Sequence, residues 1–179
     1  GNKNFLLNAV SYLVEGEGAE AWLDTIMAGR MPRIGRISLT PMLSPKGKLI
    51  GDFTVTKLAE GRFQLTASYG AQAYHMRWFQ MHLPADGSVT VRNVSLERLG
   101  FQIAGPFARE LLSAVARADV SNEAFPFLSA REMEVGLTDA LVQRVTYTGD
   151  LGYEIYVPAS QQVALYEALA AAGSDLGLK

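Results

Sequence analysis

The residues best suited to chemistry lie in the stretch Tyr147-Thr-Gly-Asp-Leu-Gly-Tyr-Glu154, which places an aromatic ring and a carboxylate seven residues apart. Its two glycines permit backbone turn angles that a Cβ atom would penalise. The flanking residues 140–146 and 153–157 are rich in β-branched and aromatic side chains. This pattern predicts a hairpin, with the glycine-rich segment as its turn.

Side chains alternate between the two faces of a strand, so Glu154 and Tyr156 are expected to point one way. The apolar side chains of Tyr153, Ile155 and Val157 then point the other way. A carboxylate on such a strand either faces water or faces a ligand that donates hydrogen bonds. Taken alone, a solvated strand glutamate is the commoner case.

Asp52 is a second candidate acid. It follows Gly51 in the run Leu49-Ile-Gly-Asp-Phe-Thr-Val55, among β-forming residues where aspartate is depleted. An inward carboxylate there would need a partner or a ligand. An outward one would discourage edge-to-edge aggregation, and the residues alone leave both interpretations open.

Composition excludes several classes of protein. With 179 residues and a net charge of −2, the chain has no electrostatic footprint for nucleic acid or an anionic membrane. No apolar run approaches the roughly 20 residues that span a bilayer. The absence of cysteine excludes disulfides and thiolate chemistry, and it fits a reducing compartment such as the cytoplasm. A mitochondrial matrix would look the same.

Familiar catalytic motifs are missing from the sequence: there is no Walker A loop, G-x-S-x-G elbow or G-x-G-x-x-G. His75 and His82 lie seven residues apart on one predicted helix without carboxylates at ligand spacing. We therefore expect packing or capping histidines and no metal site. Trp78, on the same helix, is expected to be structural because the near-neutral chain does not favour base stacking.

The chain repeats itself at a separation of 89 residues, because the apolar and glycine pattern from Val14 to Ile26 recurs from Ile103 to Val115. Each copy predicts a short strand, a glycine turn and a helix with apolar positions three and four residues apart. We expect one domain over 1–179, with pseudo-repeats of about 8–94 and 96–172.

Later elements keep the same register. Strands at 49–58 and 62–68 precede a helix in the first half, as the predicted hairpin precedes one in the second. Each half is thus predicted to be β-α-β-β-α, with an extra strand at 89–94 in the first. This order is the split β-α-β, ferredoxin-like arrangement of an α+β protein, and two such halves would leave a crevice for a ligand. Residues 28–46 and 118–136 are predicted to be long loops, which are often functional.

Four motifs now resemble one family. They are Gly47-Lys-Leu-Ile-Gly-Asp52-Phe-Thr-Val55, Ile103-Ala-Gly105-Pro-x-Ala-Arg-Glu-Leu-Leu, Phe125-Pro-Phe-Leu-Ser-Ala-Arg131-Glu132 and Tyr147-Thr-Gly-Asp-Leu-Gly-Tyr-Glu154. In this order they resemble the folate-binding domain of the glycine cleavage T-protein (aminomethyltransferase) family. The runs Leu39-Thr-Pro-Met-Leu43 and Ala73-Tyr-His-Met-Arg-Trp78 are most similar to the C-terminal half of FAD-dependent dimethylglycine and sarcosine dehydrogenases.

The resemblance implies a tetrahydrofolate site and transfer of a one-carbon unit to give 5,10-methylenetetrahydrofolate. Glu154 matches the residue that accepts the paired N–H and NH2 donors of the pterin, and Asp52 matches the acid near the reactive folate nitrogens, the candidate catalytic residue. The cofactor-binding residues that the resemblance implies are Asp52, Phe53, Thr54, Tyr147, Glu154, Ile155 and Tyr156.

The resemblance also implies partners. These are folate, a methylated amine or other aminomethyl donor, and the rest of a parent polypeptide or an FAD-dependent oxidoreductase module. FAD would bind in a separate domain outside this chain. The family's folate-contacting arginine would lie in a segment that follows Lys179. An alternative from another class is a folate-binding or regulatory module that keeps the fold without the chemistry.

Overall fold

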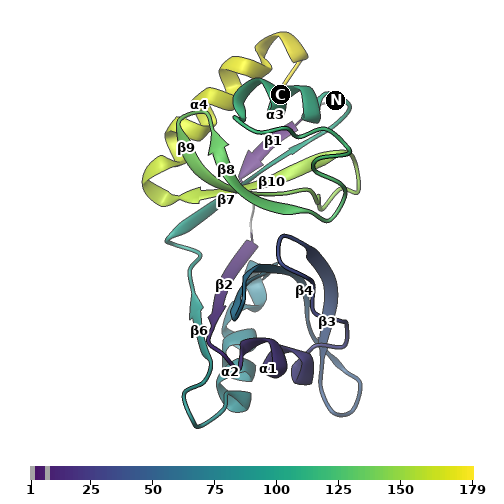
Figure 1. Ribbon diagram of the computed structural model, residues 1–179, viewed down its shortest axis with the longest axis vertical. Helices are drawn as coiled ribbons and strands as arrows, with labels where there is room; N and C mark the ends of the chain where they lie inside the picture. Colours follow the sequence, from purple (N-terminus) through teal and green to yellow (C-terminus); the bar gives the residue numbers. More distant parts are fainter. Residues whose placement is uncertain (1–2, 7–8) are drawn as a thin grey trace. The chain divides into compact units, whose positions relative to one another are not determined.

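The computed structural model describes residues 3–6 and 9–179, and they form two compact units (Figure 1). Unit 2 contains residues 9–95. Unit 1 contains residues 96–179 together with the strand at residues 3–6. Each unit has its own antiparallel five-stranded sheet and its own hydrophobic core.

The strands and helices of unit 2 follow the order β-α-β-β-β-α-β along the chain. Its elements are β2 (Ala9–Glu15), α1 (Ala19–Ile26), β3 (Ile37–Leu43), β4 (Leu49–Ala59), β5 (Arg62–Ser68), α2 (Gln72–His82) and β6 (Thr90–Asn93). The strand order is β3-β4-β5-β2-β6, and every neighbouring pair is antiparallel.

Unit 1 has a sheet of order β1-β7-β10-β9-β8, again antiparallel throughout. Its elements are β1 (Lys3–Leu6), β7 (Arg98–Ala104), α3 (Ala108–Val115), β8 (Ala130–Val135), β9 (Thr138–Gln143), β10 (Gly152–Pro158) and α4 (Gln162–Gly173). Helices α3 and α4 lie side by side on the same side of this sheet (Figure 1).

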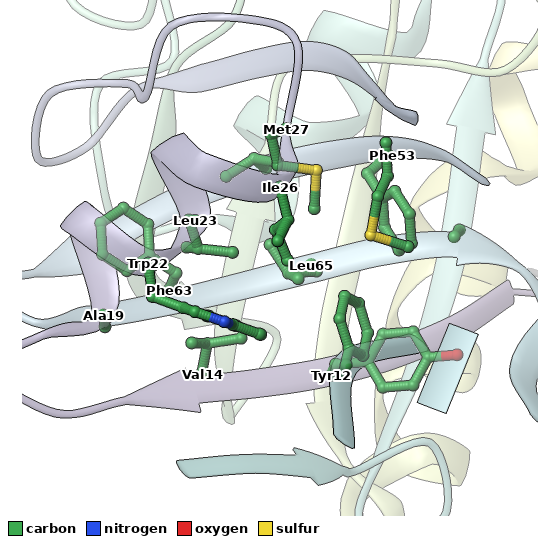
Figure 2. Packing of buried hydrophobic residues seen from close by; sticks show 14 of the residues in the cluster. Tyr12, Val14, Ala19, Trp22, Leu23, Ile26, Met27, Phe53, Phe63 and Leu65 are labelled. Atoms are coloured by element: carbon green, nitrogen blue, oxygen red, sulfur yellow. The ribbon is translucent and has the colours of Figure 1, made fainter. Parts of the chain in front are cut away.

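One face of the unit 2 sheet is buried under α1 and α2. Alternate residues of the central strands supply it, among them Tyr12 and Phe53 (Figure 2). Their rings pack with that of Phe79 from α2, with centroids 5.2 to 6.4 Å apart. Trp22 of α1 packs on Phe79 of α2 and donates a hydrogen bond of 2.7 Å to the carbonyl oxygen of His82. Aromatic pairs of this kind add to the stabilisation from area burial and hold both helices on one face.

The core of unit 1 follows the same principle. Ile103 of β7 and Tyr153 and Ile155 of β10 face the leucines of α3 and α4, and all are buried. The predicted alternation along residues 153–157 is therefore present: the odd-numbered side chains enter the core and the even-numbered ones lie on the other face.

The two predicted strand–turn–helix segments have the same local geometry. Gly16 and Gly105 adopt φ values of 135° and 127°, in a region that disfavours any Cβ. The amide of Gly16 donates to the carbonyl of Gly61 at 2.9 Å, and that of Gly105 donates to Leu151 at 2.8 Å. Each glycine thus bends the chain from a strand into a helix while staying bound to the neighbouring strand or loop.

The predicted order β-α-β-β-α is short of one strand in each half, because β3 and β8 lie inside the segments 28–46 and 118–136 that were predicted to be loops. Both are edge strands with polar residues, and β3 carries Pro41, which cannot donate to a sheet ladder. An edge strand pairs on one side only, so it tolerates such residues. The α+β class is confirmed, and β9 ends at Gln143, three residues before the predicted 146.

Candidate functional site

Glu154 lies at the centre of the unit 1 sheet. Its strand β10 is flanked by β7 and β9, and in the pairing register Glu154 stands opposite Gln102 on one side and Gln143 on the other. Paired residues of antiparallel strands project from the same face. Glu154, Gln102 and Gln143 therefore form a polar row on the face turned away from the core, and Glu154 is only 5% exposed.

The carboxyl group of Glu154 is buried and has one recorded partner. The Tyr156 hydroxyl, two residues along the same strand, donates to Oε2 at 2.7 Å. Burial raises the pKa of Glu154 to about 7, and the Tyr156 hydrogen bond offsets part of this increase. Oε1 has no donor among residues 9–179 and remains able to accept hydrogen bonds.

The turn between β9 and β10 carries Tyr147. This segment is closed on itself by a 2.8 Å hydrogen bond from the Thr146 hydroxyl to the carbonyl of Asp150, and Gly149 takes a φ of 76°. Gly152 begins β10 where a Cβ would collide with the carbonyl oxygen of Ile103. The two glycines therefore serve the turn and a close backbone approach, and the ring of Tyr147 is 91% exposed.

Gln102 connects this turn to the sheet. Its Oε1 accepts a 3.0 Å hydrogen bond from the backbone N–H of Tyr147, and the side chain is fully buried. Its Nε2 has no hydrogen-bond partner in the described part of the chain. The buried amide of Gln102 thus contacts the backbone of Tyr147 and is paired with Glu154, which in turn accepts from Tyr156. Sequence reasoning did not single out Gln102.

Two of the predicted cofactor-binding residues have side chains in the cores. Ile155 packs in unit 1 and Phe53 packs among the aromatic rings of unit 2 (Figure 2). Strand alternation explains both, because each is adjacent to a candidate acid that faces the other way. Only their backbone groups remain for a ligand.

Asp52 and Thr54 lie on β4 of unit 2, on the face opposite the core. Asp52 is exposed and pairs with Pro41 of the edge strand β3, and Thr54 is partly buried between Leu39 and Thr66. Of the two orientations that the sequence left open, Asp52 has the outward one, because its carboxylate points away from the hydrophobic core of its unit.

The comparisons with known proteins agree with the motifs. The model of the GCVT N-terminal domain family matches residues 8–179, which is nearly the whole chain. The chain belongs to the GCVT N-terminal domain family. The resemblance inferred from the four motifs is thereby confirmed.

Among relatives of this GCVT N-terminal domain, mitochondrial dimethylglycine dehydrogenase of Homo sapiens is 31% identical over 92% of the chain. An aminomethyltransferase of Geobacillus sp. (strain WCH70) is 29% identical over 93% of the chain. The chain spans 19% of the length of the first and 46% of the second.

A solved structure supports the fold of the GCVT N-terminal domain. The glycine cleavage system aminomethyltransferase T of Bartonella henselae superposes with a TM-score of 0.82, covering 99% of the chain and 47% of that protein. At 24% sequence identity this likeness establishes the fold with its two antiparallel sheets, and nothing beyond it.

The GCVT N-terminal domain also has a polar face in unit 2 that sequence reasoning missed. Gln64 and Thr66 of β5 and Thr56 of β4 are buried on the face opposite the core. The Nε2 atom of Gln64 and the hydroxyl of Thr66 have no hydrogen-bond partner within the described ranges. Polar residues alternating with apolar ones along these strands were the available signal.

The two histidines and Trp78 contact neighbouring side chains of unit 2. His75 is buried beside Phe53, its Nδ1 lies 3.3 Å from the Tyr12 hydroxyl, and burial lowers its pKa so that the ring is neutral near pH 7. His82 stacks on Trp78 with ring centroids 4.4 Å apart. Across residues 3–6 and 9–179 no group of histidine and acidic side chains has the geometry to hold a metal ion, and no helix there could span a bilayer.

Proposed function

We propose that this chain binds tetrahydrofolate through Glu154 and takes part in transfer of a methylene unit from an amine or iminium donor to it. The observation that carries the proposal is a buried carboxyl group with one oxygen still able to accept, set in a polar row at the centre of a sheet. Burying such a group is costly unless a ligand or partner satisfies it.

The hydrogen-bonding capacity of the Glu154 carboxylate fits a reduced pterin. The edge of that ring presents an N–H beside an exocyclic NH2, and a carboxylate can accept from both at once. Such charge-assisted pairs are roughly twice as strong as neutral ones. The exposed ring of Tyr147, held by its backbone bond to Gln102, supplies an aromatic surface for the flat heterocycle.

Ionisation of Glu154 follows from this assignment. The group must be charged to accept two hydrogen bonds, and burial holds its pKa at about 7. Binding a ligand that prefers the carboxylate lowers that pKa, so affinity is expected to fall as the pH drops below about 7.

Asp52 and Thr54 are assigned to the reacting end of the ligand. When bound, tetrahydrofolate would supply the nucleophilic nitrogens. The exposed carboxylate of Asp52 can stabilise the cationic donor and accept a proton, and the Thr54 hydroxyl beside it can donate or accept a hydrogen bond. This assignment is supported by the motif Gly51-Asp-Phe-Thr54 and by the orientation of both side chains away from the core.

We infer the wider context from the relatives. The activity belongs to a dimethylglycine or sarcosine dehydrogenase-like or an aminomethyltransferase protein, with any FAD in another domain. We further propose that the two units are copies of one internal repeat, supported by matching strand orders and glycine turns. The proposed compartment is the cytoplasm or the mitochondrial matrix.

Binding is tested with Glu154→Gln. Tetrahydrofolate affinity, measured by titration calorimetry under anaerobic conditions at pH 8, is expected to fall at least tenfold, since a neutral amide cannot accept both donors. Glu110→Gln, an exposed acid on α3 of the same unit, is the matched control and should bind as the unchanged protein does. Equal affinity in the Glu154 variant would refute the assignment.

Catalysis is tested separately with Asp52→Asn. We expect methylene transfer from formaldehyde or an iminium donor to fall at least 100-fold while tetrahydrofolate affinity changes less than tenfold. Folate binding without any transfer in the unchanged protein would instead favour the non-catalytic, regulatory alternative.

A further inference from the structure

We propose that Gln102 recognises the carbonyl oxygen next to the ring N–H of the ligand, so that the site selects 2-amino-4-oxo pterins over 4-amino ones. The inference deepens the proposed function and rests on it. It gives the Nε2 donor of Gln102, which has no hydrogen-bond partner among the described residues, an acceptor on the ligand, and it makes Gln102 a specificity-determining residue.

The orientation of the Gln102 amide is determined by its neighbour. The backbone N–H of Tyr147 can only donate, so the atom that receives it at 3.0 Å is the carbonyl oxygen of the side chain. Nε2 is thereby held as the other end of a planar amide. It cannot exchange places with the oxygen without breaking the bond to the turn.

The free end of this amide belongs to the same face as the Glu154 carboxyl. The two residues are directly paired between β7 and β10, which brings their side chains together on one face. Gln102 is fully buried, and its Nε2 has no partner among the described residues. A buried amide hydrogen left unpaired costs roughly 1–3 kcal/mol, which a ligand acceptor would recover.

Together the two side chains present a donor next to an acceptor. Nε2 of Gln102 is able to donate to a ligand, and Oε1 of Glu154 is able to accept from one. The complementary edge is an acceptor next to a donor, which is the C4=O and N3–H of a 2-amino-4-oxo pterin. A 4-amino group would place its N–H against the N–H of Gln102, leaving both without an acceptor.

Two substitutions separate recognition from positioning. Gln102→Leu removes both the donor and the acceptor that holds Tyr147. Gln102→Glu keeps an oxygen for the Tyr147 N–H and replaces the donor with a second acceptor. Gln161→Glu, at a half-buried residue of unit 1 whose Oε1 accepts from the N–H of Asp139, is the matched control for added charge.

The experiment measures dissociation constants of tetrahydrofolate and of its 4-amino-4-deoxy analogue for each protein, at pH 8. For Gln102→Leu we expect the loss of affinity for tetrahydrofolate to be about ten times the loss of affinity for the analogue. For Gln102→Glu the ratio of the two constants should move further toward the 4-amino ligand. The control should keep the ratio of the unchanged protein.

The outcomes distinguish this inference from the function on which it rests. If the unchanged protein binds neither ligand, the proposed function fails. If it binds tetrahydrofolate and both variants weaken the two ligands by the same factor, Gln102 only positions the turn and the inference is overturned. A thermal unfolding scan confirms that each variant is folded, and Gln102→Glu remains informative where Gln102→Leu is not.

Discussion

Gln64 in unit 2 and Glu154 in unit 1 occupy matching positions in the two sheets. Gln64 lies on β5, between β2 and β4, and pairs with Leu13 and Thr56. Glu154 lies on β10, between β7 and β9, and pairs with Gln102 and Gln143. Both are buried on the face opposite the core of their own unit.

The difference lies in what each position can do. The amide of Gln64 carries no charge and does not titrate, whereas the carboxyl of Glu154 has a Tyr156 hydroxyl on one oxygen and a pKa of about 7. Unit 2 keeps its candidate acid at Asp52, exposed near the edge of its sheet. The same strand order thus holds a titratable residue at the centre of one sheet and a neutral amide at the matching position of the other.

The largest effect is expected where the comparison concerns the cores. Phe63 and Tyr153 are matched residues, each facing the core beside Gln64 or Glu154. Phe63→Ala should lower the free energy of unfolding by about 3–5 kcal/mol, because it leaves a cavity in a packed cluster. Tyr153→Phe should cost only about 1 kcal/mol, the hydrogen bond that its hydroxyl accepts from Arg109. Urea unfolding measures both, and a loss from Tyr153→Phe as large as that from Phe63→Ala would mean that the Tyr153 hydroxyl contributes more than one hydrogen bond.

A second pair of variants exchanges the polar residues. The folded state raises the pKa of Glu154 from 4.5 to about 7, so this group makes the protein less stable as the pH rises through that interval. Glu154→Gln should therefore be more stable than the unchanged protein by about 3 kcal/mol at pH 8, with little difference at pH 4. Gln64→Glu should show the reverse, with a loss at pH 8 that shrinks at pH 4.

Denaturant unfolding at the two pH values checks this prediction. Glu110→Gln, which changes an exposed acid, serves as the control for the Glu154 variant and should show no such pH dependence. A pH-independent gain from Glu154→Gln would mean that the carboxyl is not the source of the titration.

The smallest effect concerns turns. In unit 1 the β8–β9 hairpin places Leu137 at a φ of 47°, whereas the β3–β4 connection of unit 2 uses Gly47 at a φ of 70°. A left-handed conformation disfavours leucine by roughly 1 kcal/mol relative to glycine. Leu137→Gly should raise the melting temperature by a few degrees, because its side chain is 85% exposed and loses little packing. Gly47→Leu should lower it.

Sequence reasoning was most successful where periodicity is strong. The glycine turns, the four helices and the hairpin around Glu154 follow from alternation and from three- and four-residue spacing. Strands β3 and β8 were missed because edge strands need pairing on only one side, and Pro41 and the charged residues of β8 hide their pattern.

The site was predictable in part for the same reason. Alternation placed Glu154 and Tyr156 on one face, but it could not identify Gln102, whose importance comes from its partner strand and from the turn at Tyr147. Pairing register between strands far apart in sequence is set by tertiary structure. Phe53 and Ile155 were included with their neighbours although their side chains face the cores.

Strand β1 has a consequence for biosynthesis. Residues 3–6 complete the unit 1 sheet by pairing with residues 101–104 of β7, and the whole of unit 2 lies between these segments along the chain. During translation unit 2 can therefore fold first. Strand β1 can pair only after β7, about a hundred residues later in the chain, has been synthesised. A protease cut between residues 95 and 96 would for the same reason leave the two fragments joined by a β ladder.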